Sequence, residues 1–229
     1  MSQSFSLVDA LAVSDLQVYL SRAGRVEDGS VRLIAGVGVL AVYTAILYPH
    51  GLLDRSPTVL GLRTFATDPS VSFDAVVPSR SLLDRLARVS GADAVPAATP
   101  DAEPIRVSVP LEVSTVTWAG ISPPRGGWLK VGETSAAVLS AAAAAGIHEV
   151  AEVIPAGTGE QLVQRVRGEV WGRPIDGIDF VPAGAAFAAV SLGFLDEAPV
   201  PIFETGPWTR LTTRRGHILV RRAPWTLKA

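Results

Sequence analysis

Six basic residues fall within the last 25 residues of the chain, and this cluster has the residue types needed to bind an anionic group. The stretch from 205 to 229 contains no acidic residue, so it carries a charge of +6; the rest of the chain carries −8, because the net charge is −2. Guanidinium groups bind carboxylates and phosphates through paired N–H donors. Trp208 and Trp225 flank the cluster. Its basic residues are Arg210, Arg214, Arg215, Arg221, Arg222 and Lys228.

Two hypotheses follow from this cluster. In the first, it docks on an acidic face of its own chain, of a second copy or of another protein, so the protein is a non-catalytic binding or assembly protein. In the second, the arginines from 214 to 222 contact nucleic-acid phosphates, while Trp208 or Trp225 stacks on bases. The first is favoured, because the net charge is negative and most charge clusters are solvated or self-paired.

The loop SPPRGGW at 122–128 is the second candidate binding element. Arg125 has the donors to pair with a carboxylate or phosphate, and the two glycines allow a partner to approach the backbone closely. Trp128 ends the loop. The alternative is a rigid connection between two halves of the chain, anchored in the core by Trp118 and Trp128, because proline and glycine primarily form turns.

Complete catalytic or metal-binding constellations are absent from the sequence. There is no cysteine, and the three histidines are far apart. The string GVGVLA at 36–41 fits a dinucleotide-binding pattern, but the β-branched residues after it predict a strand where that pattern needs a helix. His148 and Glu149 begin a zinc-like motif that has Glu152 in place of the second histidine. We therefore predict no catalytic residue, metal or cofactor. The alternative is an enzyme without a local signature, which a deep pocket joining Arg125 to buried acids would favour.

The order of apolar patterns predicts an α+β fold. We expect a β-rich N-terminal half with flanking helices, and a helical C-terminal half closed by a β-hairpin. In the first half, helices are predicted at 7–23 and 82–89, and strands within 31–48, 58–66, 72–77, 105–109 and 113–121. In the second half, helices are predicted over 134–154, 161–170 and 182–195, and a hairpin pairs 208–213 with 217–222.

The composition changes after Lys130 from β-branched strands to alanine-rich helices. We therefore predict two subdomains, a β-rich one at 1–121 and a helical one with the basic hairpin at 131–229. The stretch 90–104 is rich in small residues and proline and is the best candidate for a linker.

The N-terminus has no basic region followed by an apolar core, so we expect no secretory signal. The apolar stretch 33–48 is too short to span a bilayer as a helix and is interpreted as buried strands. The protein is thus expected to be soluble and cytoplasmic, with no membrane partner.

The run DLQVYLSRAGRV at 15–26 and the segment from Trp118 through SPPRGGW resemble those of an uncharacterised actinobacterial protein family of unknown function. The resemblance implies no activity, cofactor or catalytic residue.

Overall fold

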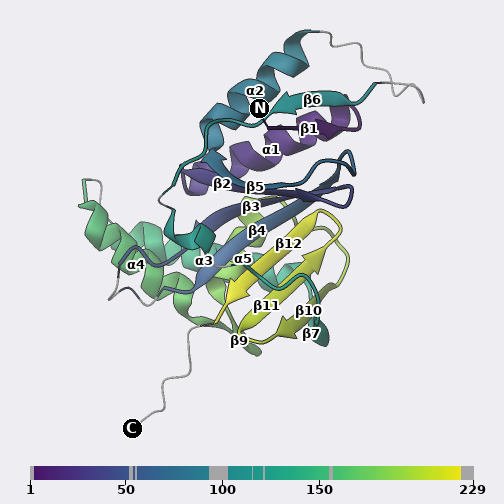
Figure 1. Cartoon of the computed structure of the whole chain (residues 1–229). Helices are drawn as coiled ribbons and strands as arrows, with labels where there is room; N and C mark the ends of the chain where they lie inside the picture. Colours follow the sequence, from purple (N-terminus) through teal and green to yellow (C-terminus); the bar gives the residue numbers. More distant parts are fainter. Residues whose placement is uncertain are drawn as a thin grey trace. The chain divides into compact units, whose positions relative to one another are not determined.

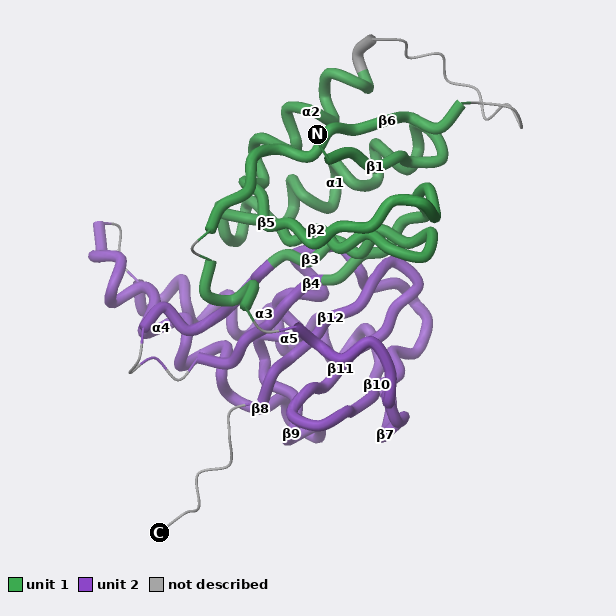
Figure 2. The backbone as a smooth tube through the Cα atoms, viewed as in Figure 1, with its two compact units in different colours: residues 1–44, 62–120 green, residues 45–61, 121–229 purple. Residues whose placement is uncertain are grey.

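The computed structural model describes residues 3–51, 54, 56–92, 103–114, 116–120, 122–154 and 157–222. The chain folds into two compact units (Figure 2). Unit 1 comprises residues 1–44 and 62–120, and unit 2 comprises residues 45–61 and 121–229. Strands β3 (Val39–Leu47) and β4 (Thr58–Ala66) contribute residues to both units.

Unit 1 contains a sheet with the strand order β5-β2-β3-β4 (Figure 1). β2 (Ser30–Gly36) pairs antiparallel with both β3 and β5 (Phe73–Pro78). Alternate residues of β2 are buried, as expected for a strand that packs one face on a core. The connection between β2 and β3 is a two-residue turn in which Val37 and Gly38 both have positive φ. The stretch 33–48 therefore forms buried strands, as predicted, and no helix begins at the GVGVLA string.

The helices of unit 1 are α1 (Ala10–Val26) and α2 (Ser79–Ala92), which pack against each other. The side chain of Asp9 caps α1 by accepting a hydrogen bond of 2.7 Å from the Ala12 amide. Tyr19, on the buried face of α1, bonds through its hydroxyl to Thr44 Oγ1 at 2.9 Å, and burial raises its pKa. β1 (Ser4–Leu7) and β6 (Ile105–Ser108) form a separate antiparallel pair.

Unit 2 contains a sheet with the strand order β12-β11-β10-β7. Each neighbouring pair in this sheet is antiparallel. Its helices are α3 (Ala136–Val153), α4 (Glu160–Gly172) and α5 (Ala183–Ser191). The strands are β7 (Leu129–Thr134), β10 (Val200–Thr205), β11 (Trp208–Thr213) and β12 (Gly216–Arg221), and a small pair is formed by β8 (Pro174–Ile175) and β9 (Ile178–Pro182).

The helical core of unit 2 is built around Trp171. Its ring stacks on Phe187 with the centroids 4.3 Å apart. A Cβ atom at Gly146 would lie 2.3 Å from the Trp171 ring, so only glycine allows α3 to approach α4 this closely. The alanines of α5 are buried beside this contact, which explains why α5 needs no large apolar side chains on most of its surface.

The α+β fold class predicted from the sequence is confirmed, and so is the basic hairpin, which forms as β11 and β12. The second half contains more strand than predicted, because β7 and β10 extend the hairpin into a sheet. The strand predicted at 113–121 is wrong. The Val113 amide donates to Val76 O, and Thr117–Gly120 form a 3₁₀ helix that buries Trp118.

The predicted division into 1–121 and 131–229 stays a prediction. Most of the proposed linker at 90–104 and Trp225 lie outside the described residues. Among the helices described, α3 is long and apolar enough to cross a membrane by length and composition alone. A single such helix is weak evidence, because helices of soluble proteins also pass this test.

Candidate functional site

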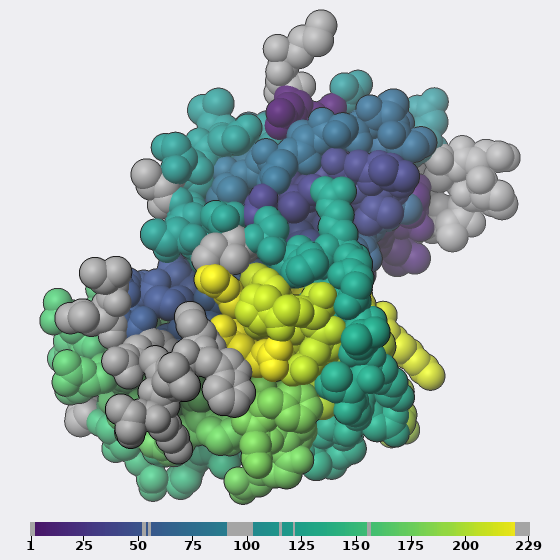
Figure 3. Space-filling model, turned by 60° about the horizontal axis from the view of Figure 1, so that its bottom comes forward, coloured from purple at the N-terminus to yellow at the C-terminus, as the bar shows by residue number. Residues whose placement is uncertain are grey.

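The outer face of the β10–β12 sheet brings together two of the residues considered above, Trp128 and Arg210. β7 and the loop before it, in teal, border the yellow hairpin in the space-filling view (Figure 3). The loop ends at Trp128, whose indole Nε1 donates a hydrogen bond of 3.1 Å to Pro124 O. This bond closes the loop on itself and fixes the indole where β7 begins. Arg125 is exposed on the same loop.

Arg210 lies between two aromatic rings. Its guanidinium carbon is 4.5 Å from the centroid of the Trp128 ring and 4.8 Å from that of Phe203. Phe203 and Arg210 are cross-strand partners on β10 and β11, which places both side chains on one face of the sheet. The sequence therefore positions this cluster through one loop and two neighbouring strands.

The charge of Arg210 is poorly compensated within the described residues. Its Nε atom is buried and has no hydrogen-bond partner there. Burial lowers the pKa of Arg210, because the charged form loses hydration that no acid replaces. His217 bonds through Nδ1 to Thr212 Oγ1 at 3.1 Å. Burial, and to a smaller extent the charge of Arg210, lower the pKa of His217, so its imidazole is neutral at neutral pH.

The other arginines of the hairpin have different surroundings. Arg222 pairs with Glu204 at 2.9 Å and donates to Gly206 O at 2.6 Å. Arg215 donates to Gly193 O at 3.2 Å. Arg214 is exposed at the turn, and Arg221 is partly exposed at the end of β12. Glu204 of the neighbouring strand β10 thus compensates part of the charge of the basic cluster, which sequence composition alone did not show.

The two predicted aromatic contacts differ in accessibility. Trp128 is partly exposed and holds Arg210, whereas Trp208 is only 3% exposed. Trp208 therefore serves the packing of unit 2 in this structure, and its ring is not placed to stack on a base. A base-stacking role for Trp208 would need its side chain to become exposed.

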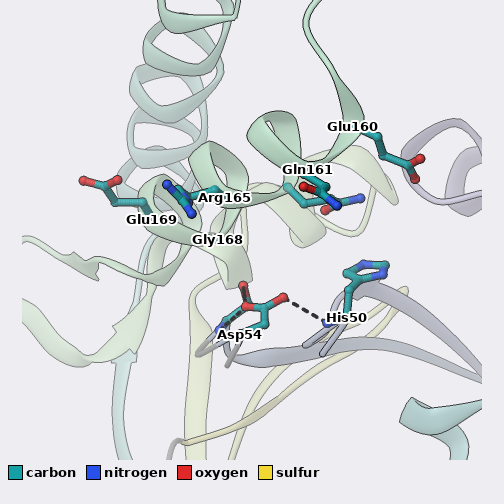
Figure 4. Close-up of a pocket in the computed structure, with 9 residues that line it drawn as sticks. His50, Asp54, Glu160, Gln161, Arg165, Gly168 and Glu169 are labelled. Atoms are coloured by element: carbon teal, nitrogen blue, oxygen red, sulfur yellow. Dashed lines mark hydrogen bonds between the residues drawn. The ribbon is translucent and has the colours of Figure 1, made fainter. Parts of the chain in front are cut away.

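A second feature of unit 2 is a pocket of about 560 Å³ between α4 and the segment that follows β3 (Figure 4). His50 and Asp54 come from that segment, and the facing wall is polar. A Cβ atom at Gly168 would lie 2.4 Å from Ser56 Oγ, so the glycine allows α4 to approach this segment. The α4 side of the pocket is lined by Glu160, Gln161, Gln164, Arg165 and Glu169.

Asp54 stabilises the loop that lines this pocket. Its Oδ1 accepts from the Ser56 amide at 2.8 Å and from Ser56 Oγ at 2.6 Å, and its Oδ2 accepts from the His50 amide at 2.9 Å. Burial raises the pKa of Asp54, but these hydrogen bonds outweigh burial and hold it below its ordinary value. A carboxylate with such a pKa and these partners is a poor general base at neutral pH. Arg125 is not among the residues that line the pocket.

Two acids of α3 form surface pairs. Glu149 pairs with Arg173 at 2.7 Å, and His148 lies 3.3 Å from Glu152 one turn along α3. Within the described part of the chain, no group of three histidines, cysteines or acids is placed to hold a metal ion. The pair His148 and Glu152 is thus a solvated helix face.

Sequence reasoning missed Phe203 and the pocket. Val200 and Ile202 are apolar residues two positions apart, a spacing typical of one buried face of a strand. Recognising this strand beside the hairpin could have placed Phe203 opposite Arg210. The pocket had no local signal, because its two walls are separated by about a hundred residues in sequence.

Two families of unknown function match separate parts of the chain. Residues 1–105 match a domain of unknown function (DUF8010), and residues 123–225 match another (DUF8185). No curated protein matches the chain. These matches agree with the predicted resemblance to a family of unknown function and assign no activity; an actinobacterial origin stays a prediction.

Solved structures with a similar fold are sliding clamps. A DnaN sliding clamp (DNA polymerase III subunit beta) from Bartonella birtlesii, bound to griselimycin, is 14% identical with a TM-score of 0.53. The Caulobacter crescentus pol III beta is 10% identical with a TM-score of 0.50. Each match covers 98% of this chain and 66% of the clamp chain. At these identities the likeness shows a shared fold, and this chain spans about two thirds of the length of those clamps.

Proposed function

We propose that the protein is a non-catalytic assembly protein that associates with a second copy of itself through strand β7. The observation that carries the proposal is the open edge of the unit 2 sheet. Within the described residues, β7 is hydrogen-bonded on one side only, to β10. Leu129 is 72% exposed and Val131 is 47% exposed on this strand. An edge strand with exposed apolar residues is a template for pairing with another chain.

The residues of β7 favour a closed pair over an open-ended stack. The register shifts between Ile202 and Phe203, so Val131 has no partner on β10. Such a bulge, together with Lys130 on the strand, disfavours the open-ended addition of further copies edge to edge. In an antiparallel two-fold pairing centred between Val131 and Gly132, Lys130 of each copy lies opposite Glu133 of the other. These two side chains already pair within the strand at 2.9 Å, and the two-fold arrangement preserves charge complementarity.

The fold likeness supports an assembly role in general terms. The similar structures are named as sliding clamps and as a subunit of DNA polymerase III. Two observations on the basic cluster weigh against nucleic acid as the partner. Trp208 is buried, and Arg222 is paired with Glu204. Phosphate binding needs several available cations, so a protein partner fits better.

Light scattering after size-exclusion chromatography tests the proposal. The wild-type protein should have the mass of a dimer at concentrations of about 10 to 100 μM, a range typical of moderate homodimers. Lys130→Glu places like charges opposite each other and should raise the dissociation constant about tenfold or more. Adding Glu133→Lys to Lys130→Glu restores the complementarity and should restore the dimer.

A matched control is Val138→Lys on α3, because Val138 is 40% exposed in the same unit. It should leave the mass unchanged, whereas Val131→Lys should reduce it. A monomeric wild type at the highest concentration would overturn the proposal. A dimer that is insensitive to both Lys130→Glu and Val131→Lys would place the interface elsewhere. A labelled single-stranded oligonucleotide, titrated at low and moderate salt, tests the nucleic-acid alternative.

A further inference from the structure

Arg210 differs from the arginines that the structure pairs with acids. Its contacts are two ring faces, and its buried Nε atom has no partner among the described residues. Arg222 on the next strand, by contrast, has both an acid and a backbone carbonyl as partners. A cation that is partly desolvated without a counter-charge is costly unless a ligand supplies that charge.

The geometry of a guanidinium indicates which kind of ligand fits it. Its five N–H donors lie in the plane of the group. The guanidinium carbon of Arg210 lies over the rings of Trp128 and Phe203, and its buried Nε atom has no hydrogen-bond partner among the described residues. A carboxylate binds a guanidinium in its plane through two parallel hydrogen bonds. Ring contacts that hold the side chain in place before binding lower the entropy that is lost on binding.

Nearby acids of unit 2 are already engaged elsewhere. Glu204 follows Phe203 on β10, so its side chain points to the opposite face of the sheet, where it pairs with Arg222. Glu133 on β7 pairs with Lys130 at 2.9 Å. The structure thus gives Arg210 an aromatic setting and leaves these acids committed to other cations.

We propose that Arg210, Trp128 and Phe203 form a binding site for a carboxylate on an acidic segment of a partner protein. This goes beyond the proposed self-association, because the site lies on the face of the sheet and needs no second copy. A carboxylate fits better than a nucleic-acid backbone, since the site holds one fixed cation. His217 beside it is neutral, and Arg215 is hydrogen-bonded to Gly193 O.

Fluorescence anisotropy with defined probes tests this site. The probe is a fluorescein-labelled peptide of eight glutamates, compared with a matched glutamine peptide and a dT oligonucleotide of the same length, at about 50 mM NaCl. The glutamate peptide should bind more tightly than either comparison probe. Arg210→Lys keeps the charge but loses the planar fork, so it should weaken binding about fivefold or more. Arg214→Lys makes the same change at the exposed turn and should alter binding less than about twofold.

A second measurement follows Arg210 itself. In a ¹⁵N-arginine spectrum, the Nε–H signal of Arg210 should be displaced by the two rings, and the glutamate peptide should shift it further. Trp128→Phe retains a ring and should bind nearly as well as wild type, whereas Trp128→Ala should weaken binding even if Arg210→Lys fails to fold. The proposal is overturned if the glutamate peptide fails to bind at about 1 mM, the millimolar limit of weak affinity. It is also overturned if the oligonucleotide binds better, or if Arg210→Lys and Trp128→Ala both leave binding unchanged. None of these outcomes depends on the mass measurement of the proposed dimer.

Discussion

Arg32 of unit 1 and Arg210 of unit 2 differ in how the structure surrounds their charge. In unit 1, Arg32 donates to Asp74 at 2.8 and 2.6 Å and to Ala119 O at 2.6 Å, so its charge and its donors are satisfied inside the unit. In unit 2, Arg210 has two ring contacts and a buried Nε without a partner. The first arrangement stabilises the fold, and the second holds a cation ready at a cost to the fold. The comparison sets an arginine whose donors are satisfied within its unit against one that we propose binds a carboxylate of a partner.

The largest expected effect is that of Arg32→Met. The Arg32 side chain is only 16% exposed, and the substitution removes three hydrogen bonds that involve a charged group. We expect a loss of about 2 kcal/mol in the free energy of unfolding, since such bonds contribute about 1.5–3 kcal/mol each when a partner is left unpaired and the losses overlap. Urea unfolding followed by circular dichroism measures this. A loss below about 0.5 kcal/mol would mean that the pair contributes no more than a surface ion pair.

Arg210→Met should leave the free energy of unfolding unchanged or raise it, in contrast to Arg32→Met. Methionine has a similar length and can pack against aromatic rings, and the change removes a buried unpaired donor. We expect the free energy of unfolding to stay constant or to rise by about 1 kcal/mol in the same urea experiment. A loss larger than that would show that the aromatic contacts of Arg210 stabilise unit 2, and the contrast with Arg32 would disappear.

The pH dependence of stability should report on His217, beside Arg210. Its folded pKa is lowered, so the unfolded chain binds more protons between the two pKa values. The contribution of neutral His217 to the free energy of unfolding is fully present above the pKa of the unfolded chain. It is lost as pH falls through the lowered pKa of the folded chain, by about 1.4 kcal/mol for each unit by which folding lowers the pKa. An NMR titration should give a higher His217 pKa in Arg210→Met, because one cause of the lowering is removed. An unchanged pKa would mean that burial alone lowers it.

The smallest expected effect is that of Arg80→Ala. Arg80 pairs with Asp28 in unit 1, but its side chain is 80% exposed. We expect the free energy of unfolding to change by less than about 0.5 kcal/mol, because exposed ion pairs contribute little. A larger loss of unfolding free energy in the urea experiment would show that the exposure of an arginine does not determine how much its ion pair stabilises unit 1.

Local patterns predicted the elements better than the site. The alternating residues of β2 and the turn at Arg214 and Arg215 were readable, because strand periodicity and hairpin turns are short-range signals. The ion pair of Arg222 and the ring contacts of Arg210 depend on cross-strand register, which composition does not give. The sequence therefore identified Trp128 and Arg210 as candidates without showing that they touch. It also treated Trp208 as available, although its side chain is only 3% exposed in the folded chain.

The most direct test of the account compares thermal unfolding of wild type and Arg210→Met, each with and without the glutamate peptide. A ligand that binds only the folded protein stabilises it by RT ln(1 + [L]/Kd) and so raises its melting temperature. If Arg210 is held ready for a carboxylate, the peptide should raise the melting temperature of wild type and leave that of Arg210→Met unchanged. An equal rise in both proteins, or no rise in wild type at saturating peptide, would contradict the account.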